Sequence, residues 1–295
     1  MRRECRRKEA LDPVALVKDS GAVDKTLREA VSLLGGFRGL KDPVLIKPNL
    51  CTDVDVTGVA TTKLDIVEAL VRLVLEEDEG LSIRIVESNS ESKFAEDAFE
   101  KLGYRTLVER FRRQGSKVSL INLSHEPLVT ADFNGLYFER PTLPKMLTGG
   151  GTFISLAVAK THSLTMVTGA MKNLFGVLPR KDQSFYHPSI NEVIVDLNRL
   201  ITPDLSIVDM RTGLEGVLRG RTRAVHAIIV ARKPLSVDAA MTQIMGFHPE
   251  RIRHLVMATR YDLGTLFPSY VGASPDTTCT TFKTPSNLSP SALIN

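Results

Sequence analysis

The stretch that decides the fold is Phe153-Ile154-Ser155-Leu156-Ala157-Val158-Ala159-Lys160-Thr161-His162. Its first seven residues are almost all apolar, which is typical of a central strand buried on both faces of a parallel sheet. The run then ends in Lys160-Thr161-His162, so a cation and an imidazole directly follow the strand. Because a core does not require these polar groups, the stretch predicts a buried strand with a functional site at its carboxyl end.

The segments on both sides of this strand alternate between strand and helix patterns. Before it, the patterns predict strands at 14–17, 44–46, 83–86 and 118–121, and helices at 24–34, 62–75, 93–102 and 107–111. After it, they predict helices at 190–201, 234–245 and 249–259, and strands at 205–209 and 225–230. Thr62 is expected to cap its helix, with Asp65 completing a capping box. This alternation predicts an α/β fold with a mostly parallel sheet and helices on both faces.

Composition divides the chain into three parts. Residues 1–12 are rich in arginine and predict a basic, disordered arm, whereas residues 13–267 carry the alternating pattern of a single α/β domain. Residues 268–295 are rich in Ser, Thr and Pro without periodicity, so we expect a disordered tail. No apolar run approaches the roughly 18 residues of a membrane span, which predicts a cytoplasmic protein with no membrane contact.

Charge and cysteine content narrow the classes of function. The net charge is +4, of which residues 1–12 contribute +2 (five basic and three acidic residues), and the chain has no Trp. We therefore expect no nucleic-acid partner. The three cysteines, Cys5, Cys51 and Cys279, are far apart and form no Cys-x-x-Cys pair. That spacing argues against a zinc ribbon or a self-contained iron–sulfur cluster, and no His/Asp/Glu spacing predicts a metal site.

Two predicted strands end in matching polar residues. The strand at 44–46 runs into Lys47-Pro48-Asn49, and the central strand runs into Lys160-Thr161-His162. Since side chains alternate along a strand, Lys47 should point with Asn49, and Lys160 with His162. Ligands of open parallel sheets bind beyond the carboxyl ends of strands, so the two pairs are expected to face one site. A structural, hydrogen-bonded role is the alternative for His162.

A helix that begins near residue 165 is expected to add further groups. It would place Thr168 and Lys172 on one face, with Asn173 beside them. Together with the two strand-end lysines, Lys172 would form a site for a phosphate or a carboxylate. Repulsion among the three ammonium groups would lower the pKa of one lysine, which would suit proton transfer.

Other polar residues are weaker candidates. His187 precedes the helix at 190–201 and either caps it or reaches the site as an acid or base. Asp209 ends a strand and is the best acidic candidate, with a turn or capping role as the alternative. We expect His248 to cap a helix and His254 to lie on the surface.

The order of these motifs resembles one protein family. The residues that carry the resemblance are Val44-Leu45-Ile46-Lys47-Pro48-Asn49-Leu50, Lys160-Thr161-His162, Met171-Lys172-Asn173-Leu174-Phe175-Gly176-Val177-Leu178-Pro179, Val208-Asp209 and Ser236-Val237-Asp238-Ala239. Over residues 14–264 the chain is similar to the family of the domain of unknown function 362. One departure is Val86-Glu87-Ser88-Asn89, which replaces a turn that usually contains glycine.

The resemblance implies a soluble bacterial or archaeal protein. Many members of the family carry an appended ferredoxin-like module, which implies coupling to an iron–sulfur redox partner. Residues 275–295 contain one cysteine and no cluster-binding spacing, so we expect such a partner to be a separate protein.

Taken together, these observations predict an enzyme that binds a small anionic substrate, with no cofactor identified. The predicted catalytic residues are Lys160, His162 and His187, and the predicted substrate-binding residues are Lys47, Asn49, Lys172, Asn173 and Asp209. The alternative is a non-catalytic anion- or cofactor-binding module that docks onto a redox protein.

Overall fold

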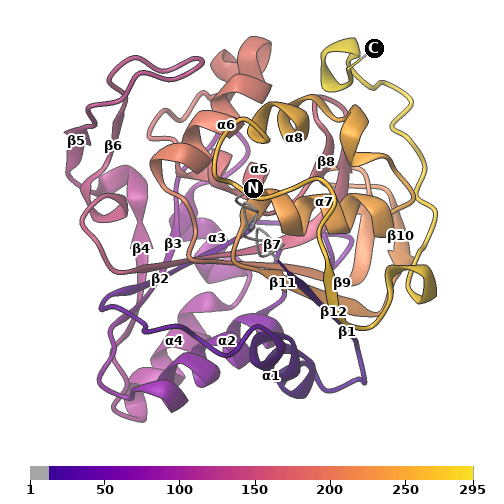
Figure 1. The fold of residues 1–295 in the computed structure, drawn as a ribbon. Coiled ribbons are helices and arrows are strands. Elements are labelled where there is room, and N and C mark those ends of the chain that lie inside the picture. The colour runs from indigo at the N-terminus through magenta and orange to yellow at the C-terminus, as the bar shows by residue number, and fades with distance from the viewer. Residues whose placement is uncertain (1–12, 295) are drawn as a thin grey trace, which may run out of the picture.

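The structure is a computed structural model that describes residues 13–294. Its centre is strand β7 (Thr152–His162), and all 11 residues of this strand are buried. β7 lies within a ten-stranded sheet whose main order is β12-β1-β11-β9-β7-β2-β3-β4, as Figure 1 shows in part. The prediction of a fully buried central strand is confirmed.

The strands next to β7 in the main order run parallel to it, and one strand farther toward the β12 edge is reversed. The parallel group consists of β9 (Leu205–Glu215), β7, β2 (Val44–Pro48), β3 (Ile83–Glu87) and β4 (Val118–Asn122). β11 (Ala227–Ala231) pairs antiparallel with β9, and β1 (Val14–Lys18) pairs antiparallel with β11. The remaining strands are β5 (Leu128–Thr130), β6 (Thr142–Pro144), β8 (Met166–Thr168), β10 (Arg221–Ala224) and β12 (Tyr270–Gly272). The sheet is therefore mostly parallel, as the alternating pattern predicts.

Helices cover both faces of the sheet, and each face has its own apolar core. One core includes residues of α1 (Val23–Leu33), α2 (Leu64–Glu77), α3 (Ala95–Lys101) and α4 (Tyr104–Arg113). The other includes residues of α5 (Ala170–Asn173), α6 (Ile190–Leu200), α7 (Pro234–Ile244) and α8 (Arg253–Ala258). In Figure 1, α1, α2 and α4 lie below the sheet, and α6, α7 and α8 lie above it. The predicted fold class is confirmed.

The segment that follows β7 differs from the prediction. Residues 166–168 form β8, a short strand that folds back onto β7 and pairs Lys160 with Thr168 and His162 with Met166. Met166 has a φ of 66°, the left-handed conformation that tight turns require. The helix expected from residue 165 therefore begins only at Ala170, and Thr168 reaches the site from a strand.

Three predictions for single residues are wrong. Thr62 does not cap α2, because its hydroxyl donates to the Leu156 carbonyl oxygen at 2.9 Å and accepts from the Asn49 N–H at 2.8 Å. His254 is fully buried in α8, because this helix packs against α6 and α7. His248 precedes a 3-10 helix but makes no side-chain capping bond, and its ring pairs with Glu250 instead.

The tail that was expected to be disordered is folded as far as the structure describes it. Tyr270–Gly272 forms β12 and pairs with β1, and the Phe282 side chain is only 2% exposed. These contacts compensate for the lack of local periodicity, so the prediction for residues 268–295 is wrong up to residue 294. The predicted basic arm, residues 1–12, lies outside the described residues. Between residues 13 and 294, no helix has the length and apolar character needed to cross a membrane.

Candidate functional site

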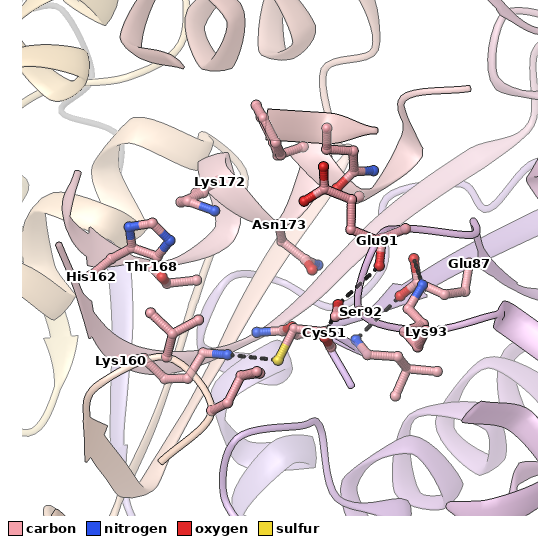
Figure 2. A pocket seen from close by; sticks show the side chains of 18 of the residues that line it. Cys51, Glu87, Glu91, Ser92, Lys93, Lys160, His162, Thr168, Lys172 and Asn173 are labelled. Atoms are coloured by element: carbon pink, nitrogen blue, oxygen red, sulfur yellow. Dashed lines mark hydrogen bonds and ion pairs between the residues drawn. The ribbon is translucent and has the colours of Figure 1, made fainter. Parts of the chain in front are cut away.

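A cavity of about 270 Å³ opens where β2, β3 and β7 end (Figure 2). Seven of the eight predicted site residues line it, namely Lys47, Asn49, Lys160, His162, Lys172, Asn173 and His187. Their convergence follows from parallel strand geometry, because the carboxyl ends of neighbouring parallel strands meet at one edge of the sheet.

Asp209 is the exception and does not line the cavity. Its carboxylate binds the Arg211 guanidinium at 2.7 Å, and the same guanidinium binds Asp65 of α2 at 2.7 Å. Asp209 therefore ties β9 to α2, and the geometry does not support its predicted contact with substrate.

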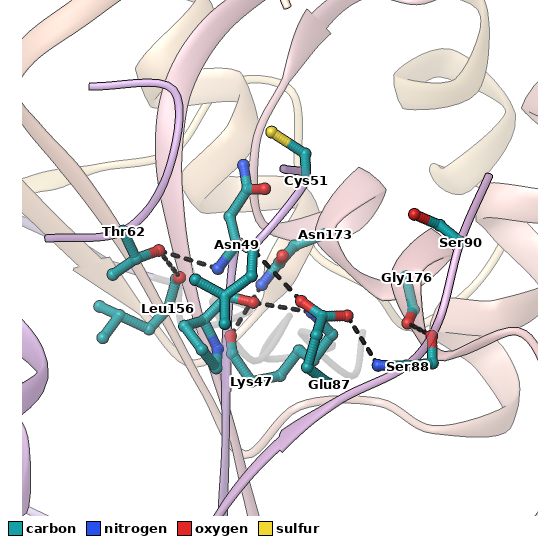
Figure 3. Close-up of polar contacts among 12 residues, drawn as sticks. Lys47, Asn49, Cys51, Thr62, Glu87, Ser88, Ser90, Leu156, Asn173 and Gly176 are labelled. Atoms are coloured by element: carbon teal, nitrogen blue, oxygen red, sulfur yellow. Dashed lines mark hydrogen bonds and ion pairs between the residues drawn. The ribbon is translucent and has the colours of Figure 1, made fainter. Parts of the chain in front are cut away.

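Lys47 lies in a closed ionic network at the ends of β2 and β3. Its side chain is 1% exposed, and its Nζ lies 2.7 Å from Glu87 Oε2 (Figure 3). Lys93 Nζ lies 3.5 Å from Glu87 Oε1, so the two lysines share one carboxylate. The backbone N–H groups of Leu50 and Ser88 also donate to that carboxylate. Burial lowers the pKa of Lys47, and Glu87 opposes this effect.

Glu87 and Lys93 were not predicted as site residues. Glu87 is the last residue of β3, so the strand-end argument that identified Lys47 would also have identified Glu87. Lys93 lies in the loop before α3 and has no comparable signal in the sequence.

Lys160 has different partners from those of Lys47. Its Nζ donates to the Ala60 carbonyl oxygen at 2.8 Å and lies 3.2 Å from Cys51 Sγ. The Cys51 thiol is directed to the same carbonyl oxygen at 3.3 Å. No carboxylate of residues 13–294 lies within ion-pairing distance of Lys160. Cys51 was not predicted, although it continues the alternation of Lys47 and Asn49 at the end of β2.

Lys172 is the second lysine of the cavity that has no acidic partner among the described residues. It is half-buried at the cavity wall, with its Nζ 5.0 Å from the centre of the Phe175 ring. Burial, reinforced by the charge of Lys160, lowers the pKa of Lys172 to about 8. At neutral pH most molecules therefore carry an ammonium group here.

The two histidines of the cavity are neutral at pH 7. Burial first, and then the charges of Lys172 and Lys160, hold the pKa of His162 well below its usual value. His162 Nδ1 accepts the Leu164 N–H at 3.1 Å, so Nε2 of the neutral ring carries the proton and can donate. His187 lies at the exposed rim, in the 3-10 helix Gln183–Ser189, and burial and Lys172 lower its pKa. His187 is therefore available as a proton acceptor.

Of the three amide side chains that line the cavity, Asn173 is bonded, whereas the NH2 groups of Asn49 and Gln183 have no partner among the described residues. Asn173 Nδ2 donates to the Lys47 carbonyl oxygen at 2.9 Å and to Ser155 Oγ at 3.1 Å, so it joins α5 to the sheet. Asn49 Nδ2 and Thr168 Oγ1 are buried at the cavity wall, and no described residue bonds them. Buried polar groups are nearly always hydrogen-bonded, so these two atoms are free to bond a solvent molecule or a ligand in the cavity.

The start of α5 is held in place by Asp238 of α7. The Asp238 carboxylate accepts the Ala170 N–H at 2.6 Å and the Met171 N–H at 2.9 Å. A Cβ on Gly169 would collide with this carboxylate, so only glycine fits at that position. This contact explains why the Ser-Val-Asp-Ala motif accompanies the Lys172 motif, and it orients Lys172 toward the cavity.

This chain is similar to a curated protein and, in fold, to a solved structure. The thylakoid-associated protein sll1697 of Synechocystis sp. is 26% identical over 248 residues, covering 81% of this chain and 74% of that protein. Its name refers to thylakoids, so a cytoplasmic location for the present chain stays a prediction. The lactate racemase apoprotein of Thermoanaerobacterium thermosaccharolyticum has a TM-score of 0.51 at 9% identity. That match covers 80% of this chain and 58% of the racemase, and at this identity it shows a shared α/β fold alone.

A family model described as domain of unknown function, DUF362, matches residues 44–243. The matched region begins at β2 and includes the strand ends that line the cavity, the Lys172 motif and Asp238. The chain therefore belongs to the DUF362 family, as the order of its motifs predicts.

Proposed function

We propose that the protein is an enzyme that binds a small anion, a phosphate or carboxylate compound, in the cavity at the ends of β2, β3 and β7. The observation that carries the proposal is an unbalanced charge. Four lysines and two glutamates line the cavity, and Lys47 and Lys93 share Glu87. Lys160 and Lys172 have no such partner among the described residues.

An anion would relieve the cost of burying Lys172. A cation that has lost part of its hydration is unfavourable unless it is paired, and its lowered pKa reflects this cost. An opposite charge at 4 Å contributes about 4 kcal/mol at the effective dielectric constant of a protein surface, before desolvation of the ligand. Anion binding should therefore raise the pKa of Lys172 and keep it charged.

Uncharged donors of the cavity would complete the recognition of an anion. Asn49 Nδ2, Thr168 Oγ1 and His162 Nε2 can each donate one hydrogen bond. Several donors that converge with ammonium groups suit the oxygens of a phosphate or a carboxylate. The cavity volume of about 270 Å³ suits a small metabolite.

Catalysis is the second part of the proposal, and it rests on His187. A neutral imidazole at the rim of an anion site can take a proton from a bound substrate or from water. A non-catalytic module would need the lysines but not His187. An iron–sulfur partner stays a prediction from the family resemblance, because the geometry of the cavity does not use one.

Calorimetric titration with inorganic phosphate, pyrophosphate and malonate tests the anion site. We expect at least one of these anions to bind the wild type, and Lys172→Met to weaken that binding about tenfold or more. Lys117→Met is the matched control, because Lys117 is exposed and precedes β4 at the opposite edge of the sheet. No binding by the wild type, or equal binding by Lys172→Met, would overturn the proposal.

A further inference from the structure

The cavity contains a thiol that the proposed anion site does not use. Cys51 lies three residues beyond the end of β2, lines the cavity and is partly exposed. Its Sγ is 3.2 Å from Lys160 Nζ (Figure 2). Lys172 and Lys47 line the same cavity as Cys51. An ammonium group next to a sulfur atom stabilises the negative charge that the sulfur carries when it attacks or leaves.

The second free cysteine of the described residues provides an internal comparison. Cys279 is exposed, and its Sγ contacts the Gln243 carbonyl oxygen at 3.9 Å, with no lysine bonded to it. Cys279 does not line the cavity. Of these two cysteines, only Cys51 lies in the cavity and next to a lysine.

Unpartnered donors share the cavity with Cys51 and can hold an oxygen atom of a ligand there. Asn49 and Thr168 are each 6% exposed, and neither Asn49 Nδ2 nor Thr168 Oγ1 has a partner in the described chain. In Figure 3 the Asn49 amide extends to the same side of the β2 end as the Cys51 thiol. Donors placed next to a nucleophile stabilise the oxygen that becomes negative when the nucleophile adds to a carbonyl group.

We infer that Cys51 is a covalent nucleophile that accepts an acyl group from an anionic, activated donor of the acyl phosphate class. This inference rests on the proposed anion site. The thiolate sulfur adds to the acyl carbon, and the bond between that carbon and the bridging phosphate oxygen breaks. Phosphate leaves with the electron pair beside Lys172, and a thioester remains on Cys51.

Water then completes the reaction. His187 accepts a proton as the water oxygen adds to the thioester carbon, and the Cys51 sulfur leaves with the electron pair as a thiolate. His187 then passes its proton to the departed phosphate, so the products are a carboxylic acid and hydrogen phosphate, and His187 is neutral again. No oxidant or reductant takes part, because the sum of the two steps is hydrolysis of an acyl phosphate.

Alkylation of the full-length protein by two reagents tests whether Cys51 is a reactive nucleophile within an anion site. Iodoacetate is an anion and iodoacetamide is neutral, and peptide mass spectrometry gives the rate at each cysteine. We expect the ratio of the iodoacetate rate to the iodoacetamide rate to be about tenfold higher at Cys51 than at Cys279. Phosphate should protect Cys51, and Lys172→Met should lower the ratio at Cys51. Equal ratios at Cys51 and Cys279 would overturn the inference.

Incubation with acetyl phosphate tests the covalent step itself. We expect one acetyl group on the Cys51 peptide of the His187→Gln variant, which lacks the base that completes hydrolysis, and hydroxylamine should remove this group because a thioester is labile to it. The Cys51→Ser variant should form no such thioester, and Cys279→Ser should react like the wild type. Acetylation confined to lysines, which resists hydroxylamine, would overturn the inference. If phosphate still binds in that case, the proposed anion site survives; if phosphate does not bind, the proposed function fails as well.

Discussion

Lysines lie on both sides of the cavity, but they have different partners on the two sides. On the side of β2 and β3, Lys47 and Lys93 are buried and share the Glu87 carboxylate. On the side of β7 and α5, Lys160 and Lys172 meet a thiol, a carbonyl oxygen and an aromatic ring. The difference is one carboxylate. A lysine with a buried acidic partner stabilises the fold, whereas a lysine without one is available to bind a ligand.

The largest effect is expected when the balanced side loses its carboxylate. Glu87→Gln leaves two buried ammonium groups without a counter-charge, so we expect the free energy of unfolding to fall by about 3–5 kcal/mol. Urea denaturation measures this change. Glu91→Gln, at an exposed position of the same cavity, should change stability by less than about 0.5 kcal/mol. If the free energy of unfolding falls by less than about 1 kcal/mol in Glu87→Gln, Glu87 does not stabilise the fold by neutralising Lys47 and Lys93.

The opposite result is expected on the unbalanced side. Lys172→Met removes a half-buried cation without an acidic partner, so urea denaturation should show no loss of stability or a gain of up to about 1 kcal/mol. Anion affinity should nevertheless fall about tenfold, which corresponds to about 1.4 kcal/mol. A stability loss as large as that of Glu87→Gln would show that Lys172 has a structural partner.

The pH dependence of binding sharpens the comparison further. Lys172 has a pKa of about 8 in the folded protein, so its ammonium form is lost as the pH rises through about 8. Anion affinity should therefore fall about tenfold between pH 7 and pH 9, because the charged fraction falls by that factor. Titration calorimetry at several pH values measures this fall, and Lys172→Met should show a flat profile over that range.

The lowered pKa of Lys172 also determines how its contribution to stability varies with pH. The folded pKa of Lys172 lies below the ordinary lysine value of 10.5, so the unfolded chain binds more protons between about pH 8 and that value. The contribution of Lys172 to stability should therefore rise with pH in this window. Comparison of the wild type with Lys172→Met by urea denaturation at pH 7.5 and 9.5 isolates this contribution, and an opposite sign would contradict the assigned environment.

The smallest effect on the site is expected at Asp209. Asp209→Asn weakens the contact with Arg211 outside the cavity, so stability should fall by about 1–3 kcal/mol, as expected for loss of a buried charged hydrogen bond. The affinity for the anion should change less than twofold, which calorimetry can resolve. If the affinity for the anion changes by more than about fivefold, Asp209 contributes to the anion site, as the sequence pattern predicts.

Local patterns were sufficient for most of the fold and for part of the site. The apolar run of β7 predicted its burial, and the alternation of strands and helices predicted the mostly parallel sheet. The polar strand ends predicted that Lys47 and Lys160 would meet, because parallel neighbours end at one edge. These inferences succeed because they depend on periods of two and about 3.6 residues, which adjacent positions carry.

Other features depended on partners that are distant in the sequence. Residues 166–168 became a strand because β7 was available to pair with them, and the C-terminal segment folded because β1 accepted β12. Lys160 and Cys51 are 109 residues apart, and Lys47 and Glu87 are 40 residues apart. The sequence alone determined which polar side chains come to this edge of the sheet. Only the tertiary structure decided which of them are neutralised, because ion pairing depends on distances of a few ångströms between segments that no local pattern relates.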